Sequence, residues 1–144
     1  MPRRYVGGIV FDGVRVLLGR RSVSRERYPG VWDIFGGHIE HGETPHAALS
    51  RELLEELGIE IVGATAAGTL RGTGDPEPVP FIMDVFVVWS WSGHPRLGNH
   101  EHDAIQWFHP DELDARIGVI DERLPEFVQA AVAGGLFAIR DDLK

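Results

Sequence analysis

One stretch of 23 residues constrains this chain more than any other part of it. Residues 37–59 read GHIEHGETPHAALSRELLEELGI, which combines turn glycines with one arginine and five glutamates. Thr44 is a suitable helix N-cap, Pro45 suits the first helical position, and Gly58 is typical of a helix C-terminus. We therefore expect a glycine turn followed by a helix that begins near Pro45 and ends near Gly58.

The glutamates of this helix should share one face. At about 100° per residue, Glu52, Glu55 and Glu56 fall within an arc of about 100°. The opposite side carries the apolar residues expected to face the core, namely Ala47, Leu53, Leu54 and Leu57. Like charges at this spacing destabilise a helix by a few tenths of a kcal/mol, whereas clustered carboxylates suit a hard divalent cation such as Mg²⁺. A merely solvated acidic face would leave the neighbouring glycines and arginine unexplained.

Composition narrows the classes of function. The chain has no cysteine, which excludes disulfides, thiolate metal sites and cysteine nucleophiles. Its net charge of −8 argues against a polymeric nucleic acid as the partner. No apolar run approaches the roughly 18 residues of a membrane span, and the glycine-interrupted N-terminus makes a poor signal peptide. We expect one cytoplasmic domain over residues 1–144, with no membrane partner.

The remaining pattern predicts a mixed sheet packed between helices, an α+β fold of the αβα sandwich type. Residues 4–11 and 14–18 should form a hairpin around Asp12-Gly13. Further strands are expected over residues 31–35, 59–71, 81–91 and 104–108, a helical turn over 111–113, and a helix over 124–133 that ends at Gly134-Gly135. Residues 19–30 and 72–80 are predicted to be loops.

The central stretch matches the signature of the Nudix hydrolases at every constrained position. Those positions are Gly37, Glu43, Arg51, Glu52, Leu53, Glu55, Glu56, Gly58 and Ile59. The flanks are similar to the MutT-type branch of that family, which carries an Arg-Arg pair, a Gly-Gly pair and a Glu six residues ahead of a Trp. The matching residues are Arg20-Arg21, Gly36-Gly37, Glu101 and Trp107.

The resemblance implies a Nudix fold and hydrolysis of a diphosphate bond in a nucleoside diphosphate linked to some group X. Mg²⁺ or Mn²⁺ should be the cofactor. By the same resemblance, Glu55 and Glu56 are direct metal ligands, Glu52 is a ligand or the base, and the Gly36 carbonyl is a further ligand. Glu101 is the extra carboxylate, as ligand or base, although it could also be a solvated loop acid.

Two further residues of the signature should orient the metal ligands. Arg51 and Glu43 take this role in the catalytic site that the resemblance implies. From the helix spacing alone, Arg51 can pair with Glu55 one turn later or reach back to Glu43 in the preceding loop.

Substrate-binding residues are predicted from charge and aromatic character. The segment after residue 18 holds the densest positive cluster, which is either a phosphate-facing arm or a solvated connection; it contains Arg20, Arg21, Arg25 and Arg27. Trp32, Phe35 and Phe81 are candidates for stacking on a base, and their alternative is ordinary packing in the core.

The leading hypothesis is a nucleoside triphosphate pyrophosphohydrolase, acting on ordinary or damaged nucleotides. The alternatives are hydrolysis of ADP-ribose or a nucleotide sugar, and a non-catalytic Nudix fold that senses nucleotides. MutT-type sanitising enzymes use an asparagine before the last helix to read an oxidised purine, and Arg123 stands nearest that place here, with Asn99 in an earlier loop. The expected partner is a small nucleotide, and a homodimer is left open.

Overall fold

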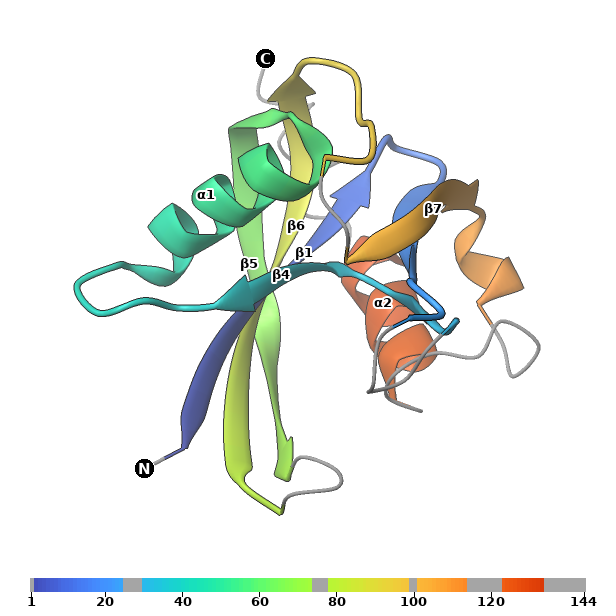
Figure 1. The fold of residues 1–144 in the computed structure, drawn as a ribbon. Coiled ribbons are helices and arrows are strands. Elements are labelled where there is room, and N and C mark those ends of the chain that lie inside the picture. The colour runs from blue at the N-terminus through green and yellow to red at the C-terminus, as the bar shows by residue number, and fades with distance from the viewer. Residues whose placement is uncertain (1, 25–29, 74–77, 99–100, 114–122, 134–144) are drawn as a thin grey trace.

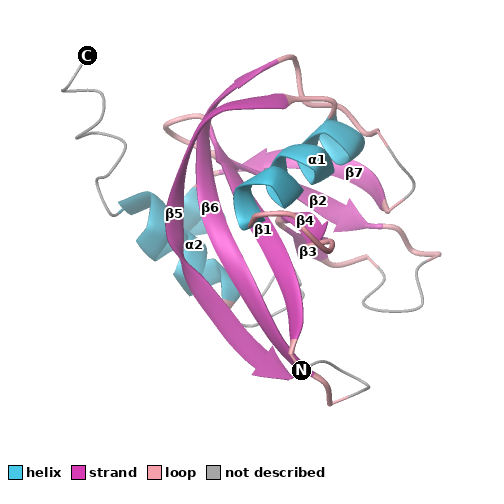
Figure 2. Cartoon of the chain, turned by 90° about the vertical axis from the view of Figure 1, so that its left-hand side faces the viewer, coloured by secondary structure: helices cyan, strands magenta, loops and turns pink. Residues whose placement is uncertain are grey.

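A computed structural model describes residues 2–24, 30–73, 78–98, 101–113 and 123–133. Within these residues seven strands form one mixed sheet, with helices on both of its faces (Figures 1 and 2). The strands are β1 (Arg3–Phe11), β2 (Val16–Arg21), β3 (Trp32–Asp33), β4 (Phe35–His38), β5 (Glu60–Thr73), β6 (Pro80–Ser92) and β7 (His102–Phe108). The helices are α1 (Pro45–Leu57), α2 (Leu124–Ala133) and a 3₁₀ turn (Pro110–Glu112).

Strand β1 is the centre of the sheet. The strand order is β3-β2-β1-β6-β5, and the pairing of β1 with β6 is parallel while the other pairings are antiparallel. On the edge of β1 away from β6, its first half pairs with β4 and its last two residues pair with β2, which in turn pairs with β7. The sheet therefore divides beside β1, and β4 crosses the division, running away from β7 and toward the loop before α1 (Figure 1).

Alternating side chains of β1 feed two separate cores. Val6 and Val10 belong to the core under α1, which also holds Leu49, Leu53 and Leu57. Ile9 and Phe11 belong to the core on the other face, together with Leu124 and Val128 of α2. A strand buried on both faces reads as an apolar run rather than a clean alternation. The predicted αβα sandwich is confirmed.

The predicted signals define α1. Thr44 accepts a hydrogen bond from the backbone N–H of Ala47 at 3.1 Å, and Pro45 is the first helical residue. Gly58 ends the helix in the left-handed conformation, with φ of 68°, and its N–H donates to the Leu54 carbonyl oxygen at 3.0 Å.

Several predicted boundaries are wrong. Residues 19–21, expected in a loop, continue β2 because their backbone pairs with β3 on one side and β7 on the other. Residues 72–73 and 80 lie in β5 and β6, since the hairpin pairs Gly72 with Phe81 and Thr73 with Pro80. The predicted strand 31–35 is divided between β3 and β4. In the first two cases strand pairing outweighs polar composition.

Some expectations lie outside the described residues: Arg25 and Arg27, Asn99, and the glycine stop after α2. Among the helices that the structure describes, none combines the length and apolar character needed to cross a membrane.

Candidate active site

Two glycines of β4 let the carboxylates of α1 approach the strand backbone. Gly36 has φ of 152°, and a Cβ there would collide with the carbonyl oxygen of Val6 on β1. At Gly37 a Cβ would lie 2.5 Å from Oε1 of Glu52. The first glycine is therefore required by the backbone of the sheet, and the second makes room for a side chain of the site.

Arg51 connects the loop, the helix and β4. Its Nε donates to Glu43 Oε2 at 2.8 Å, and its Nη2 donates to Glu43 Oε1 at 3.0 Å. The same guanidinium donates to Glu52 Oε1 at 2.9 Å and to the His38 carbonyl oxygen at 3.1 Å. Glu55 Oε2 is more distant, at 3.7 Å from Nη1. Of the two pairings that the helix spacing left open, the reach back to Glu43 has the hydrogen bonds.

These contacts shift the pKa values of Glu43 and Arg51 in opposite directions, and each shift favours the charged form of its group. Hydrogen bonds from Arg51 and from the Glu40 backbone N–H lower the pKa of Glu43 from 4.5 to about 2. The hydrogen bond to Glu43 in turn raises the pKa of Arg51 further above its usual value. Both groups are thus held in their charged forms, which keeps the network closed at neutral pH.

The helical wheel is wrong about Glu56, which is 2% exposed instead of facing outward. Leu54, placed on the core side, is 53% exposed, and Ala47 is exposed as well. The reason is that α1 packs on β4 as well as on β1 and β5, so that its buried side is rotated toward the strand. There Glu56 Oε2 accepts a hydrogen bond from the Gly36 N–H at 3.1 Å.

Burial makes Glu56 the most perturbed carboxyl group described. Desolvation, followed by the charges of Glu52 and Glu101, raises its pKa from 4.5 to about 10. Its hydrogen-bond partners among the described residues are the Gly36 N–H and Glu101, and neither is basic. The neighbouring carboxyl group of Glu52 is perturbed as well: burial raises its pKa even though the hydrogen bond from Arg51 lowers it. Such carboxylates become stable as anions when a cation is placed among them.

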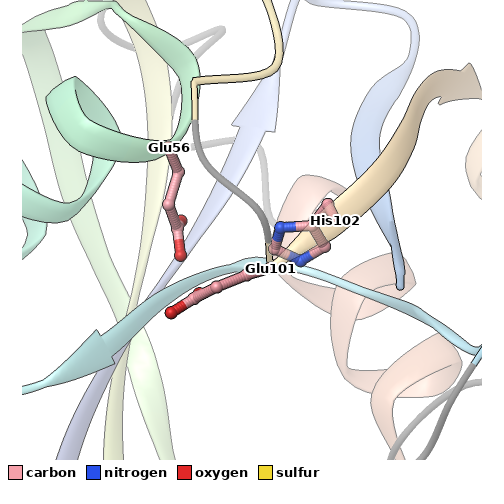
Figure 3. A group of neighbouring side chains, drawn as sticks. All are labelled: Glu56, Glu101 and His102. Atoms are coloured by element: carbon pink, nitrogen blue, oxygen red, sulfur yellow. The ribbon is translucent and has the colours of Figure 1, made fainter. Parts of the chain in front are cut away.

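Glu101 approaches α1 from a segment that is distant in the sequence, between β6 and β7. The Arg96 N–H donates to the Leu57 carbonyl oxygen at 3.0 Å, and the Gly98 N–H donates to the Glu56 carbonyl oxygen at 2.8 Å. These bonds fasten the segment after β6 to the end of α1. Glu101 follows shortly and directs its carboxylate toward Glu56 (Figure 3). The predicted extra carboxylate is therefore near the motif glutamates.

His102 is a member of this cluster that sequence reasoning missed. It is 8% exposed, and one of its nitrogens lies within 4.8 Å of carboxylate oxygens of Glu56 and Glu101 (Figure 3). Its position directly after Glu101 was the available signal. The donor set of carboxylates and an imidazole fits a divalent cation. Glu55, by contrast, has a side chain that is 56% exposed.

Arg20 and Trp32 lie together on neighbouring strands. Arg20 Nε donates to Asp103 Oδ1 at 2.7 Å, and its guanidinium carbon lies 6.0 Å from the centroid of the Trp32 ring. Trp32 is partly buried against Phe108, with ring centroids 5.1 Å apart. Arg21 is partly buried, and its backbone N–H donates to the Val31 carbonyl oxygen at 2.8 Å. Arg20 is therefore already ion-paired, but its side chain remains 43% exposed.

Phe35 was expected among the base-stacking residues, and the structure contradicts this. The side chain is fully buried in the core under α1, and its ring contacts His102 edge to face with centroids 5.2 Å apart. A ring with no exposed surface cannot stack on a ligand. Phe81 remains available because it is partly exposed, with its ring 6.2 Å from that of Tyr5.

Comparison with known proteins agrees with this geometry. The model of the NUDIX domain matches residues 1–130. The chain is 34% identical over 108 residues to the CTP pyrophosphohydrolase of Escherichia coli, covering 74% of this chain and 76% of that one. It is 33% identical over 113 residues to the oxidized purine nucleoside triphosphate hydrolase of Mus musculus, covering 77% and 69%.

Solved structures give the same result. The MutT NUDIX hydrolase of Burkholderia pseudomallei superposes with a TM-score of 0.77 at 28% identity, covering 87% of this chain and 95% of that one. The E. coli ORF135 protein superposes with a TM-score of 0.76 at 25% identity, covering 94% of this chain and 91% of that one. The domain match and the identity to these relatives together show that this chain belongs to the NUDIX family, as a MutT-like pyrophosphohydrolase.

Proposed function

We propose that the protein is a divalent-metal-dependent nucleoside triphosphate pyrophosphohydrolase that releases a nucleoside monophosphate and pyrophosphate. The observation that carries the metal dependence is the buried Glu56 carboxyl, which lies beside Glu101 and whose hydrogen-bond partners, the Gly36 N–H and Glu101, carry no positive charge. A cation between these groups would offset their mutual repulsion and the cost of burial. Mg²⁺ or Mn²⁺ is the expected ion.

Five groups are proposed to hold the cation: the carboxylates of Glu52, Glu55, Glu56 and Glu101, and the carbonyl of Gly36. A bound divalent cation supplies positive charge that stabilises the phosphoryl oxygens in the transition state and favours ionisation of water. In the reaction a water oxygen attacks phosphorus, the bond from phosphorus to the bridging oxygen breaks, and pyrophosphate leaves.

Proton removal from water is assigned to a carboxylate next to the cation. Glu52 and Glu101 are the two candidates. Arg51 holds one oxygen of Glu52 by a hydrogen bond of 2.9 Å, and Glu43 fixes Arg51 in turn. These two residues therefore act by positioning Glu52.

The substrate class is inferred from the relatives and the exposed side chains. Two of the relatives described above are named for hydrolysis of nucleoside triphosphates, which supports a triphosphate over ADP-ribose. Arg20 and Arg21 are proposed to face the phosphates, and Trp32 and Phe81 to contact the base. Loss of an aromatic platform such as Phe81 should raise KM about 5-fold or more with kcat unchanged, since stacking on a base contributes about 1–3 kcal/mol.

The direct test is to incubate the protein with Mg²⁺ and a panel of ribo- and deoxynucleoside triphosphates, ADP-ribose and nucleotide sugars. Pyrophosphate with a nucleoside monophosphate is the expected product pair. Release of AMP from ADP-ribose without activity on triphosphates would replace the proposed substrate class. Tight nucleotide binding with no hydrolysis of any compound would favour a sensor. Glu56→Gln should lower kcat by orders of magnitude while the fold is kept.

Three broader expectations stay predictions. They are a single domain over residues 1–144, residence in the cytoplasm, and a small nucleotide as partner with a homodimer left open. Analytical ultracentrifugation of the full chain shows directly whether it forms a homodimer.

A further inference from the structure

His102 occupies a seat that is shaped for a planar ring. A Cβ at Gly19 would lie 2.6 Å from His102 Cδ2 and 2.8 Å from Phe35 Cε1. The Phe35 ring meets the imidazole at 60°. A larger residue at position 19 would push the imidazole from its place, so the glycine and the buried phenylalanine together fix its orientation.

The strand that carries His102 is irregular at this point. Arg20 pairs with Ala104, whereas the next residue, Arg21, pairs with His102, so Asp103 is an extra residue on β7. Asp103 is held outside by its 2.7 Å ion pair with Arg20. Bulges of this kind re-aim neighbouring side chains and are frequent beside active sites.

The buried imidazole lies among acidic groups. One of its nitrogens and one oxygen from each of Glu56 and Glu101 all lie within 4.8 Å of one another (Figure 3). Ligand atoms at about 2.1 Å from one ion are separated by at most about 4.2 Å. Small rotations of the exposed Glu101 side chain are enough to close that difference.

We propose that His102 donates an imidazole nitrogen to the cation held by Glu56 and Glu101. This inference rests on the metal dependence of the proposed function and extends it to the choice of ion. A site built from oxygen alone suits Mg²⁺, whereas an imidazole nitrogen raises the affinity for Mn²⁺ and the later transition metals. The protein should therefore bind Mn²⁺ more tightly than Mg²⁺, by a margin that depends on His102.

Pulsed EPR of the Mn²⁺-loaded protein tests the contact without relying on activity. The wild-type spectrum should show coupling of Mn²⁺ to a ¹⁴N nucleus, which changes to a ¹⁵N pattern when histidine is labelled with ¹⁵N. His102→Phe keeps a ring in the seat but has no nitrogen, and should abolish the coupling. His46→Phe is the matched control, because His46 is exposed on α1 and lies outside the cluster; it should leave the coupling unchanged.

Calorimetric titration with each metal alone gives the second readout. In His102→Phe the Kd for Mn²⁺ should rise at least 10-fold, and the Kd for Mg²⁺ should change less than 3-fold. His102→Gln, which replaces the nitrogen by an oxygen donor, should bring the two metals closer in affinity. Equal losses for both metals would assign His102 a purely structural role and overturn the proposal.

Failure of this inference is distinguishable from failure of the proposed function. Wild-type protein that hydrolyses nucleotides and binds Mn²⁺ without any nitrogen coupling would overturn the role of His102 alone. Wild-type protein that binds neither metal would overturn both. Loss of metal binding in Glu56→Gln together with retained nitrogen coupling in His102→Phe would keep the site and reject the imidazole ligand.

Discussion

The Arg51 guanidinium and the Glu43 carboxylate are joined by two hydrogen bonds, of 2.8 and 3.0 Å, that use both oxygens of the acid. The residues are eight positions apart and lie in different elements, with Arg51 inside α1 and Glu43 in the loop before it. The remaining Arg51 donors reach Glu52 and the His38 carbonyl oxygen. The Arg51 guanidinium thus connects the loop before α1, the helix itself and β4.

Arg51→Lys should therefore damage catalysis although it preserves the charge. An ammonium cannot reproduce the planar two-point contact with Glu43 and also reach Glu52, and loss of a group that orients metal ligands costs about 10- to 100-fold in activity or metal affinity. Steady-state kinetics with saturating Mg²⁺ measure the effect on kcat. The control is Arg4→Lys, at an exposed ion pair with Asp84, which should leave kcat unchanged. Equal rates in the Arg51 variant and wild type would contradict the assigned role.

The depressed pKa of Glu43 predicts a loss of stability in acid. Above pH 4.5 the carboxyl is ionised in both the folded and unfolded protein, so its stabilising effect is complete. As the pH falls from 4.5 toward 2, the unfolded chain takes up a proton that the folded protein does not, and the effect is lost. Thermal unfolding of Glu43→Gln and wild type should show a Tm difference that is constant above pH 5 and shrinks toward pH 2. A Tm difference that stays constant down to pH 2 would contradict this role of the pair formed by Glu43 and Arg51.

The local features of this site can be predicted from the sequence, whereas the burial of its side chains cannot. Thr44, Pro45 and Gly58 act through their own backbone geometry, so the limits of α1 can be predicted from them alone. The same holds for the helix at residues 124–133, whose apolar spacing gives its bounds. The cluster of motif glutamates could be predicted as well, because their spacing places them on one side of one helix.

Depth and tertiary neighbours could not be predicted in this way. A helical wheel orders side chains around the helix axis but does not say how the helix is rotated against its sheet. The wheel therefore places Glu52, Glu55 and Glu56 all on the outer face, whereas Glu56 is buried. Phe35 is in the core because it alternates with Gly36 on β4, whose inner face is fixed by pairing with β1. His102 joins the site through a bulge on β7 that has no sequence signature.

The two glycines of β4 should respond to alanine in different ways. A methyl group at Gly37 meets the carboxylate end of Glu52, a flexible side chain that can move aside. Gly37→Ala should therefore fold with a Tm near that of wild type and lose activity at least 10-fold. At Gly36 the methyl meets the rigid carbonyl oxygen of Val6, and φ of 152° is unfavourable for any side chain. Gly36→Ala should unfold at a markedly lower temperature. Calorimetry and kinetics on both variants check the contrast, and a strong Tm loss in Gly37→Ala would contradict it.

Glu56 should destabilise the metal-free protein as the pH rises. Below pH 4.5 its carboxyl is protonated in both states, but between 4.5 and about 10 the unfolded chain is ionised while the folded protein keeps the proton. The free energy of unfolding then falls by at most about 1.4 kcal/mol per pH unit from this group. Glu56→Gln has no proton to lose, and its amide can still accept from the Gly36 N–H. In the presence of a chelator its Tm advantage over wild type should be small at pH 5 and larger at pH 8, as measured by calorimetry.

Addition of Mg²⁺ should reverse this order. The cation competes with the proton for Glu56, so it should raise the Tm of wild type by an amount that grows with pH, because binding to the folded state alone stabilises it by mass action. Glu56→Gln should gain much less. Glu55→Gln, at a carboxylate that is 56% exposed, is the control for loss of a motif charge without burial, and its Tm in chelator at pH 8 should stay closer to wild type than that of Glu56→Gln. A Tm of Glu56→Gln that tracks wild type from pH 5 to 8 in chelator would show that Glu56 is ionised in the metal-free fold, and with it the argument from burial to a required cation would fall.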